Sequence, residues 1–196
     1  MSIKPDVLIP ARNEARTVAG VVSVFRHHPE VGTVYVVDNA STDDTGPIAA
    51  RAGAEVITCR TSGKGEAVTA GLKLVTSPRV IFCDADLIHL TPEHVSALAA
   101  PYRGMTIGVV DKMRNSSGQR SLPTELARIT KLSGWGMERD LLLMCLRLGI
   151  PRKFVELDGC TQWWFEYILT HKGALPPGLS EKLNHRPFLM PVGGYA

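Results

Sequence analysis

Several features that would place a chain in a special class are missing from this sequence. No apolar run approaches the 18 residues that a membrane-spanning helix needs. The N-terminal stretch has one lysine and then a short apolar run that Pro10 interrupts, which is not a signal-peptide pattern, so we expect a cytoplasmic protein. The cysteines are scattered and form no CxxC pair, so we expect reduced, mostly buried thiols without a zinc site or a disulfide framework. They are Cys59, Cys83, Cys145 and Cys160.

A large excess of charge of one sign is also missing. The net charge is +3, with 21% charged and 44% hydrophobic residues, which is ordinary for a soluble globular domain. A mildly basic chain suits an anionic ligand without requiring one. The chain has 196 residues, enough for one domain with a sizeable core, and contains no internal repeat or low-complexity segment.

Strand patterns alternate with helix patterns over the first half of the chain. A short β-rich run at residues 6–10 precedes apolar residues at helical spacing within residues 14–28, and this order is repeated. The fourth run, residues 79–86, is apolar on both faces, which is typical of a central strand in a parallel sheet covered on both sides. The pattern therefore predicts an α/β domain with a mostly parallel central sheet and helices on both faces.

Beyond Asp86 the pattern is less regular. The expected elements are, in order, a helix over residues 91–102 capped by Thr91, a strand over 105–115, a loop over 116–123, a helix over 124–149 interrupted at its glycines, a strand over 154–159 and a helix over 161–173. We expect this part of the chain to close over the sheet.

Polar segments follow the four predicted strands of the first half. In open α/β sheets, ligands bind beyond the carboxyl ends of the strands, so these segments are expected to meet on one rim. The segments are residues 10–14, 38–41, 60–65 and 84–86.

Asp84 and Asp86 are the sharpest signal on this rim. Side chains two residues apart in an extended segment point the same way, and carboxylate oxygens are hard ligands suited to Mg²⁺ or Mn²⁺, which often also binds phosphate oxygens. A metal–diphosphate site is one interpretation. The alternative is that one aspartate caps the following helix and the other is a solvated loop charge.

Two further segments carry weaker signals of nucleotide binding. "SGKGEA" could hold a phosphate with Lys64, although the spacing of a Walker loop is absent. Asp38 ends the second strand, where a carboxylate often binds ribose or a base edge, but a turn followed by a helix cap explains it equally well.

Four motifs read together are more specific than any one of them. "VLIPARNEARTV", "VYVVDNASTDDT", "GKGEAV" and "VIFCDADL", in this order and spacing, resemble GT-A fold glycosyltransferases of the family-2 kind. The resemblance covers about the first half of the chain. It implies one GT-A domain over residues 1–196, with a nucleotide-sugar-binding half (1–90), an acceptor half (91–183) and a C-terminal tail (184–196).

The same resemblance implies a set of donor-site residues. The nucleotide sugar would be bound by Pro10, Ala11, Arg12, Asn13, Glu14, Asp38, Asn39 and Lys64, and by the DxD segment Asp84, Ala85 and Asp86. The two aspartates of that segment would bind Mn²⁺ or Mg²⁺, with Asp86 the firmer ligand.

A second, looser resemblance is to glucosyl-3-phosphoglycerate synthases and similar sugar transferases. "SGWGMERDLLL" resembles their glycine-aromatic-glycine-x-glutamate segment, which would place Gly134, Trp135, Gly136, Met137 and Glu138 beside the transferred sugar. The alternative is a helix N-terminus with Trp135 in the core. These relatives also use a downstream histidine as a metal ligand, which here would be His185, although it follows the strand later than in the relatives.

The resemblance implies a metal-dependent hexosyltransferase that moves glucose or a similar sugar from a nucleotide-diphosphate sugar, with UDP favoured, to an acceptor hydroxyl. If the reaction inverts configuration it needs a carboxylate base, for which Glu138, Asp140 and Asp158 are the candidates. The acceptor is open between a small phosphorylated acid and a hydroxymethylated base in DNA. The oligomeric state, including a homodimer, is also open.

Three alternatives have distinct signatures. A DNA acceptor would use a basic strip, which otherwise is a solvated face; the strip comprises Lys112, Arg114, Arg120, Arg128 and Lys131. A nucleotidyltransferase should show a glycine-rich, arginine-containing loop after the first strand, and "PARNEART" lacks those glycines. A non-catalytic nucleotide-sugar sensor would need the first half of the chain alone, and its biological effect would survive loss of Asp86.

Overall fold

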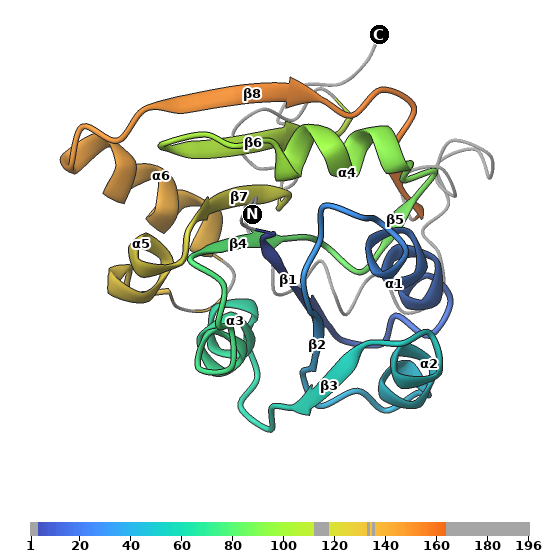
Figure 1. Ribbon diagram of the computed structural model, residues 1–196. Coiled ribbons are helices and arrows are strands. Elements are labelled where there is room, and N and C mark those ends of the chain that lie inside the picture. Colours follow the sequence, from blue (N-terminus) through green and yellow to red (C-terminus); the bar gives the residue numbers. More distant parts are fainter. Residues whose placement is uncertain (1–3, 112–117, 133, 135, 164–196) are drawn as a thin grey trace, which may run out of the picture.

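The computed structural model describes residues 4–111, 118–132, 134 and 136–163. Its main sheet consists of β1 (Asp6–Ala11), β2 (Val34–Asp38), β3 (Glu55–Thr58), β4 (Arg79–Phe82), β6 (Met105–Val109), β7 (Arg120–Pro123) and β8 (Arg152–Glu156). These strands lie in the order β3-β2-β1-β4-β7-β6-β8 (Figure 1). A separate two-stranded ribbon pairs β5 (Leu87–Ile88) with β9 (Thr161–Gln162). The prediction of a mostly parallel sheet is confirmed, because β7 runs antiparallel to both of its neighbours while the other pairs in the sheet are parallel.

Helices cover both faces of this sheet, as predicted. On one face lie α1 (Val18–Arg26), α2 (Thr45–Arg51) and α4 (Pro92–Ala99), and on the other lie α3 (Lys64–Leu72), α5 (Thr124–Ile129) and α6 (Met137–Arg147) (Figure 1). Each set of helices packs its buried side chains into its own hydrophobic cluster against the sheet. Among the described residues, no helix is long and apolar enough to cross a membrane.

The central strand β4 shows why these residues form a doubly covered sheet. Val80 and Phe82 pack into the cluster under α3, α5 and α6, while Ile81 and Cys83 pack into the opposite cluster, and all four are buried. Burying an aliphatic or aromatic side chain of this size contributes about 1.5–3 kcal/mol. The strand is therefore fixed on both faces, and the residues that follow it have a fixed starting point.

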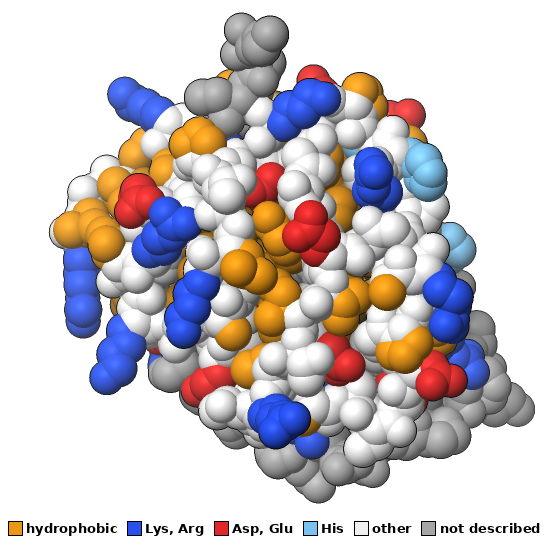
Figure 2. Space-filling model, turned by 60° about the horizontal axis from the view of Figure 1, so that its bottom comes forward, with side chains coloured by type: hydrophobic (Ala, Val, Ile, Leu, Met, Phe, Trp, Pro, Cys, Tyr) orange, Lys and Arg blue, Asp and Glu red, His pale blue; other side chains and the backbone are white. Residues whose placement is uncertain are grey.

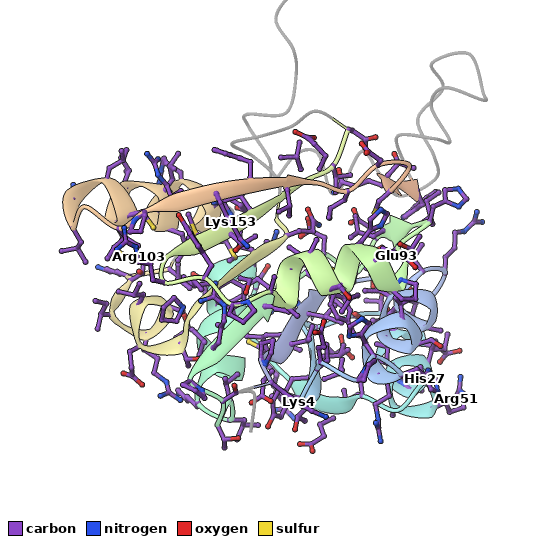
Figure 3. All side chains as sticks on the ribbon, turned by 45° about the horizontal axis from the view of Figure 1, so that its top comes forward. Lys4, His27, Arg51, Glu93, Arg103 and Lys153 are labelled. Carbon is purple, nitrogen blue, oxygen red and sulfur yellow. The ribbon has the colours of Figure 1, made fainter. Side chains whose placement is uncertain are left out.

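The helix ends follow local signals in the sequence. Thr91 caps α4 as predicted: its hydroxyl accepts a hydrogen bond from the His94 amide, its own amide donates to the His94 ring, and Pro92 takes the first helical position. At their C-terminal ends, α1 stops just before His27 and α2 stops at Arg51. Figure 3 labels these two residues. A basic side chain in the last turn interacts favourably with the helix dipole.

The structure corrects two expected elements in the second half. The segment expected as a loop over residues 116–123 contains β7, a buried strand between β4 and β6, and its polar side chains have partners inside the protein: Arg79 Nε donates to Ser121 Oγ at 2.9 Å. The helix expected from residue 161 begins with Thr161 and Gln162 in β9 instead, because they pair with β5. The rest of that segment, residues 164–173, lies outside the described residues.

Candidate active site

The polar loops after β1, β2 and β3 meet at one end of the sheet. The Asn13 amide donates to Ser41 Oγ at 3.0 Å, and Asn13 Oδ1 accepts from the Thr42 amide at 2.8 Å. Asn39 Nδ2 donates to the Thr61 carbonyl at 2.6 Å. These contacts confirm that three of the four predicted segments, residues 10–14, 38–41 and 60–65, converge on one rim.

Asn39 connects this rim to the start of α3. Its side chain is buried, and its Oδ1 accepts from the Gly63 amide at 3.0 Å, directly before α3. Arg12 reaches the same loop through a 2.8 Å hydrogen bond to Ser62 Oγ. Asn39 thus links the loop after β2 to the loop after β3, and Arg12 links the loop after β1 to the same loop.

The other predicted donor residues of the first two loops are fixed largely through the backbone. Pro10 and Ala11 are the last two residues of β1, and Ala11 pairs with Asp38. Asp38 Oδ1 accepts from the Ser41 amide at 3.0 Å, the turn interaction that the sequence left open as an alternative. Glu14 is buried, and its carbonyl accepts the first amides of α1.

Two non-glycine residues in these loops have left-handed backbone conformations. Asn13 and Ala40 both have a φ of 55°. Such conformations cost on the order of 1–3 kcal/mol for a residue with a side chain, and they are enriched at ligand sites. Asn13 lies in the loop after β1 and Ala40 in the loop after β2, so both conformations occur on the rim.

A buried cluster of opposite charges lies beside these loops. Lys64 Nζ lies 2.5 Å from Asp84 Oδ1 and 2.5 Å from Glu138 Oε1. Arg120 brings a second buried cation: burial lowers the pKa of Arg120, and the nearby carboxylates of Glu138 and Asp84 oppose that lowering. The cluster joins α3, the end of β4, β7 and α6.

Two glycines help to bring Glu138 to this cluster. The Gly65 amide donates to the Gly134 carbonyl at 2.8 Å, and the Gly134 amide donates to the Glu66 carboxylate at 3.0 Å. Gly136 then precedes α6, so that helix starts beside the start of α3. The segment of the second resemblance thus lies against the donor rim, although Trp135 itself lies outside the described residues.

The three candidate bases differ in their surroundings. Glu138 pairs with Lys64, whereas the Asp140 carboxylate pairs with exposed Arg139 at 3.2 Å. Asp158 is exposed in the turn after β8. In the part of the chain that the structure describes, neither Asp140 nor Asp158 contacts the Lys64–Asp84 pair.

Asp84 and Asp86 are both buried, at 7% and 3% exposure, so neither is a solvated loop charge. The argument from an extended segment does not apply to them, because β4 ends at Phe82 and Ala85 and Asp86 lie in a turn. Their partners differ accordingly. Asp84 Oδ2 accepts from Gln119 Nε2 at 3.0 Å, and Asp86 accepts from Gln162 Nε2 at 3.3 Å.

The donor set around this turn fits a hard divalent cation. Within the described ranges no group of three or more His, Cys, Asp or Glu side chains could hold a metal, and the candidate ligands are the carboxylates of Asp84 and Asp86. Mg²⁺ and Mn²⁺ suit oxygen ligands, and Mg²⁺ in particular is usually held by one or two carboxylates with phosphate oxygens and water completing its shell. His185, the third predicted ligand, lies outside the described residues.

The contacts of Gln119 and Gln162 with the aspartates were not predicted from the sequence, and the predicted position of Arg120 was wrong. Arg120 was expected in an exposed basic strip but is fully buried against the charge cluster. The guanidinium of Arg128 donates to the Val75 carbonyl at 2.7 Å, while Lys112 and Arg114 lie outside the described residues. On the face shown in Figure 2, lysine and arginine side chains are scattered among acidic and neutral ones. Local sequence patterns carry no signal for either glutamine, because both approach the aspartates through long-range strand pairing.

The order of strands and helices, with its polar loops at one end of the sheet, is that of the GT-A glycosyltransferase fold. The family model described as glycosyl transferase family 2 matches residues 6–151. The chain belongs to this family.

Individual relatives agree with the assignment. An uncharacterized glycosyltransferase of Mycobacterium tuberculosis (strain ATCC 25618 / H37Rv) is 41% identical over 80 residues, which cover 41% of this chain and 35% of the relative. A glucosyl-3-phosphoglycerate synthase of Mycolicibacterium smegmatis is 35% identical over 108 residues, covering 49% of this chain and 35% of the relative. The chain therefore spans about a third of the length of these relatives.

A solved structure extends the similarity to most of the chain. Glucosyl-3-phosphoglycerate synthase from Mycobacterium tuberculosis, in complex with Mn²⁺, uridine-diphosphate-glucose and phosphoglyceric acid, superposes with a TM-score of 0.73 at 26% identity. The match covers 82% of this chain and 72% of that one.

Proposed function

We propose that this chain is a metal-dependent hexosyltransferase that moves glucose, or a similar sugar, from a UDP-sugar to an acceptor hydroxyl. The observation that carries the proposal is the buried contact of Lys64 with Asp84 and Glu138, at the rim where the loops after β1, β2 and β3 meet. The likeness to a synthase solved with Mn²⁺ and uridine-diphosphate-glucose supports the choice of cofactor and donor.

Each part of the rim has a role in this proposal. The loops carrying Asn13 and Asp38 would hold the nucleotide, and Asp84 and Asp86 would hold Mn²⁺ or Mg²⁺. When bound, the metal neutralises charge on the diphosphate and makes it a better leaving group. The ammonium group of Lys64 contacts Asp84. Like the metal, it would place a positive charge beside the phosphates.

Glu138 is the carboxylate we place beside the transferred sugar. In an inverting reaction it would accept the proton of the acceptor hydroxyl. The location of Glu138 in the buried cluster with Asp84 favours it over Asp140, which pairs with an exposed arginine, and over Asp158, which is exposed. In a retaining reaction the same carboxylate would bind sugar hydroxyls.

For the acceptor we propose a small phosphorylated acid, in keeping with the phosphoglyceric acid named for the similar solved structure. The buried position of Arg120 removes one member of the basic strip that a DNA acceptor would use. A cytoplasmic location and a homodimer remain predictions.

The test is a transfer assay on the whole chain with UDP-glucose and GDP-glucose, with 3-phosphoglycerate as acceptor, in Mn²⁺ and in EDTA. We expect UDP release that depends on Mn²⁺, is lost in Asp86→Ala and persists in Asp140→Asn, the matched control on α6. Absence of both turnover and thermal stabilisation with either nucleotide sugar would contradict the proposal.

A further inference from the structure

The chain contains two glutamines, and each donates its side-chain amide to one of the two aspartates after β4. Gln119 contacts Asp84, and Gln162 contacts Asp86. Both glutamines are buried, at 1% and 5% exposure. Neither belongs to the motifs that indicated a nucleotide-sugar site.

Gln119 is brought to Asp84 by the antiparallel strand β7. Because Phe82 pairs with Arg120, the residues just before β7 lie opposite the residues just after β4. Gln119 Nε2 donates to Asp84 Oδ2 at 3.0 Å, while the main-chain carbonyl of Gln119 accepts from the Gly108 amide at 2.8 Å. The backbone bond to β6 holds the glutamine, and the glutamine holds the carboxylate.

Gly118 makes this approach possible. A Cβ atom at Gly118 would lie 2.2 Å from Asp84 Oδ2, well inside van der Waals contact. Glycine therefore lets the chain before β7 pass directly over the carboxylate. The close approach of Gly118 and the hydrogen bond from the Gln119 side chain together restrict the orientation of the Asp84 carboxylate.

Gln162 is brought to Asp86 by the ribbon of β5 and β9. Gln162 pairs with Leu87, the residue after Asp86, and its Nε2 lies 3.3 and 3.5 Å from the two carboxylate oxygens of Asp86. The next residue, Trp163, donates its backbone amide to the Asp86 carbonyl at 2.9 Å. The side chain of Asp86 is thus held by β9, and its main chain by the residue that follows β9.

The chemistry of these donors suits a supporting role at a cation site. A buried carboxylate that accepts a hydrogen bond from a fixed donor has fewer orientations to lose when a cation binds, and such bonds to a charged acceptor are among the stronger ones in proteins. An amide is neutral, so it orients the carboxylate without cancelling its charge. Outer partners of this kind typically change metal affinity 10–100-fold when removed.

We infer that Gln119 and Gln162 are positioning residues that hold Asp84 and Asp86 in the arrangement that binds the divalent cation of the donor complex. The inference rests on the proposed function. It means that the cation site is assembled from both halves of the chain: the first half supplies the ligands, and β7 and β9 of the second half orient them.

The experiment measures Mn²⁺ binding in the presence of UDP, by electron paramagnetic resonance of free Mn²⁺, for wild type, Gln119→Met and Gln162→Met. Methionine keeps the length of the side chain and removes the donor. We expect each variant to bind Mn²⁺ about 10-fold more weakly or worse. The matched control is Thr106→Val in β6, whose buried hydroxyl has no hydrogen-bond partner among the described residues, and it should bind Mn²⁺ as wild type does.

The outcomes separate this inference from the proposed function. Wild type that binds no Mn²⁺ with UDP would overturn the proposed function. Wild-type binding that both methionine variants match would overturn the inference alone. Circular dichroism verifies folding, and if a methionine variant does not fold, Gln119→Asn and Gln162→Asn, which withdraw the amide by one methylene, must show the same weakening for the inference to stand.

Discussion

Replacing Lys64 with methionine removes the buried cation that joins Asp84 to Glu138. The side chains of the three residues are 9%, 10% and 14% exposed, so solvent screens these ion pairs little. Breaking a buried pair by removing one partner costs about 3–5 kcal/mol, because the remaining charge loses its compensation. A typical domain has a free energy of unfolding of about 5–15 kcal/mol. We therefore expect Lys64→Met to fold but to have a markedly lower free energy of unfolding.

The assay for this prediction is urea unfolding followed by circular dichroism. The matched control is Arg139→Met, since the Arg139–Asp140 pair lies on the same helix as Glu138 but the Arg139 side chain is 69% exposed. Exposed pairs contribute about 0–1 kcal/mol, so the control should stay close to wild type. If Lys64→Met loses less than about 1 kcal/mol and matches the control, the reasoning about a buried charge cluster is refuted.

The remaining predictions concern the rim, the thiols and a helix cap. Gly118→Ala should displace the Asp84 carboxylate and weaken Mn²⁺-dependent binding of UDP-glucose in calorimetry, and an unchanged affinity would count against the close approach. Burial raises the pKa of the Cys160 thiol to about 12 and that of Cys83 well above its usual value, so at pH 8 a thiol reagent should react slowly with the native protein and rapidly with all four cysteines after unfolding. Because the unfolded thiols lose their protons first, the free energy of unfolding should fall as the pH rises from about 9 towards 12, and a flat urea stability profile would contradict this. Thr91→Ala should cost about 1 kcal/mol in urea unfolding through loss of the α4 cap, and no loss would argue against the cap.

The first half of the fold could be predicted because its signals are local. Valine- and isoleucine-rich runs such as β4 alternate with helical spacing, and each run ends at polar residues that the parallel topology gathers on one rim. The rim followed from this pattern, whereas the candidate donor-site residues followed from the family resemblance that the motifs in those loops carry. The division into halves at residue 90 and the tail at 184–196 remain predictions.

The second half was harder because its interactions are long-range. β7 contains Arg120 and Ser121, whose composition is typical of a loop, and they are buried because Arg79 and the charge cluster supply partners that are distant in the sequence. β9 is two residues long and exists through its pairing with β5, so periodicity cannot find it. Gln119 directly precedes β7, and Gln162 lies in β9. Because neither strand could be predicted from local patterns, the sequence did not connect these glutamines with the aspartates.

The most direct test of the central claim is calorimetric titration of UDP-glucose into wild type and Asp86→Asn, each with Mn²⁺ and with EDTA. Asparagine keeps the shape of the side chain and removes the charge that the cation needs. The account predicts tight binding to wild type with Mn²⁺, with much weaker binding in EDTA and in the variant under both conditions. Equal affinity in all four titrations would contradict it.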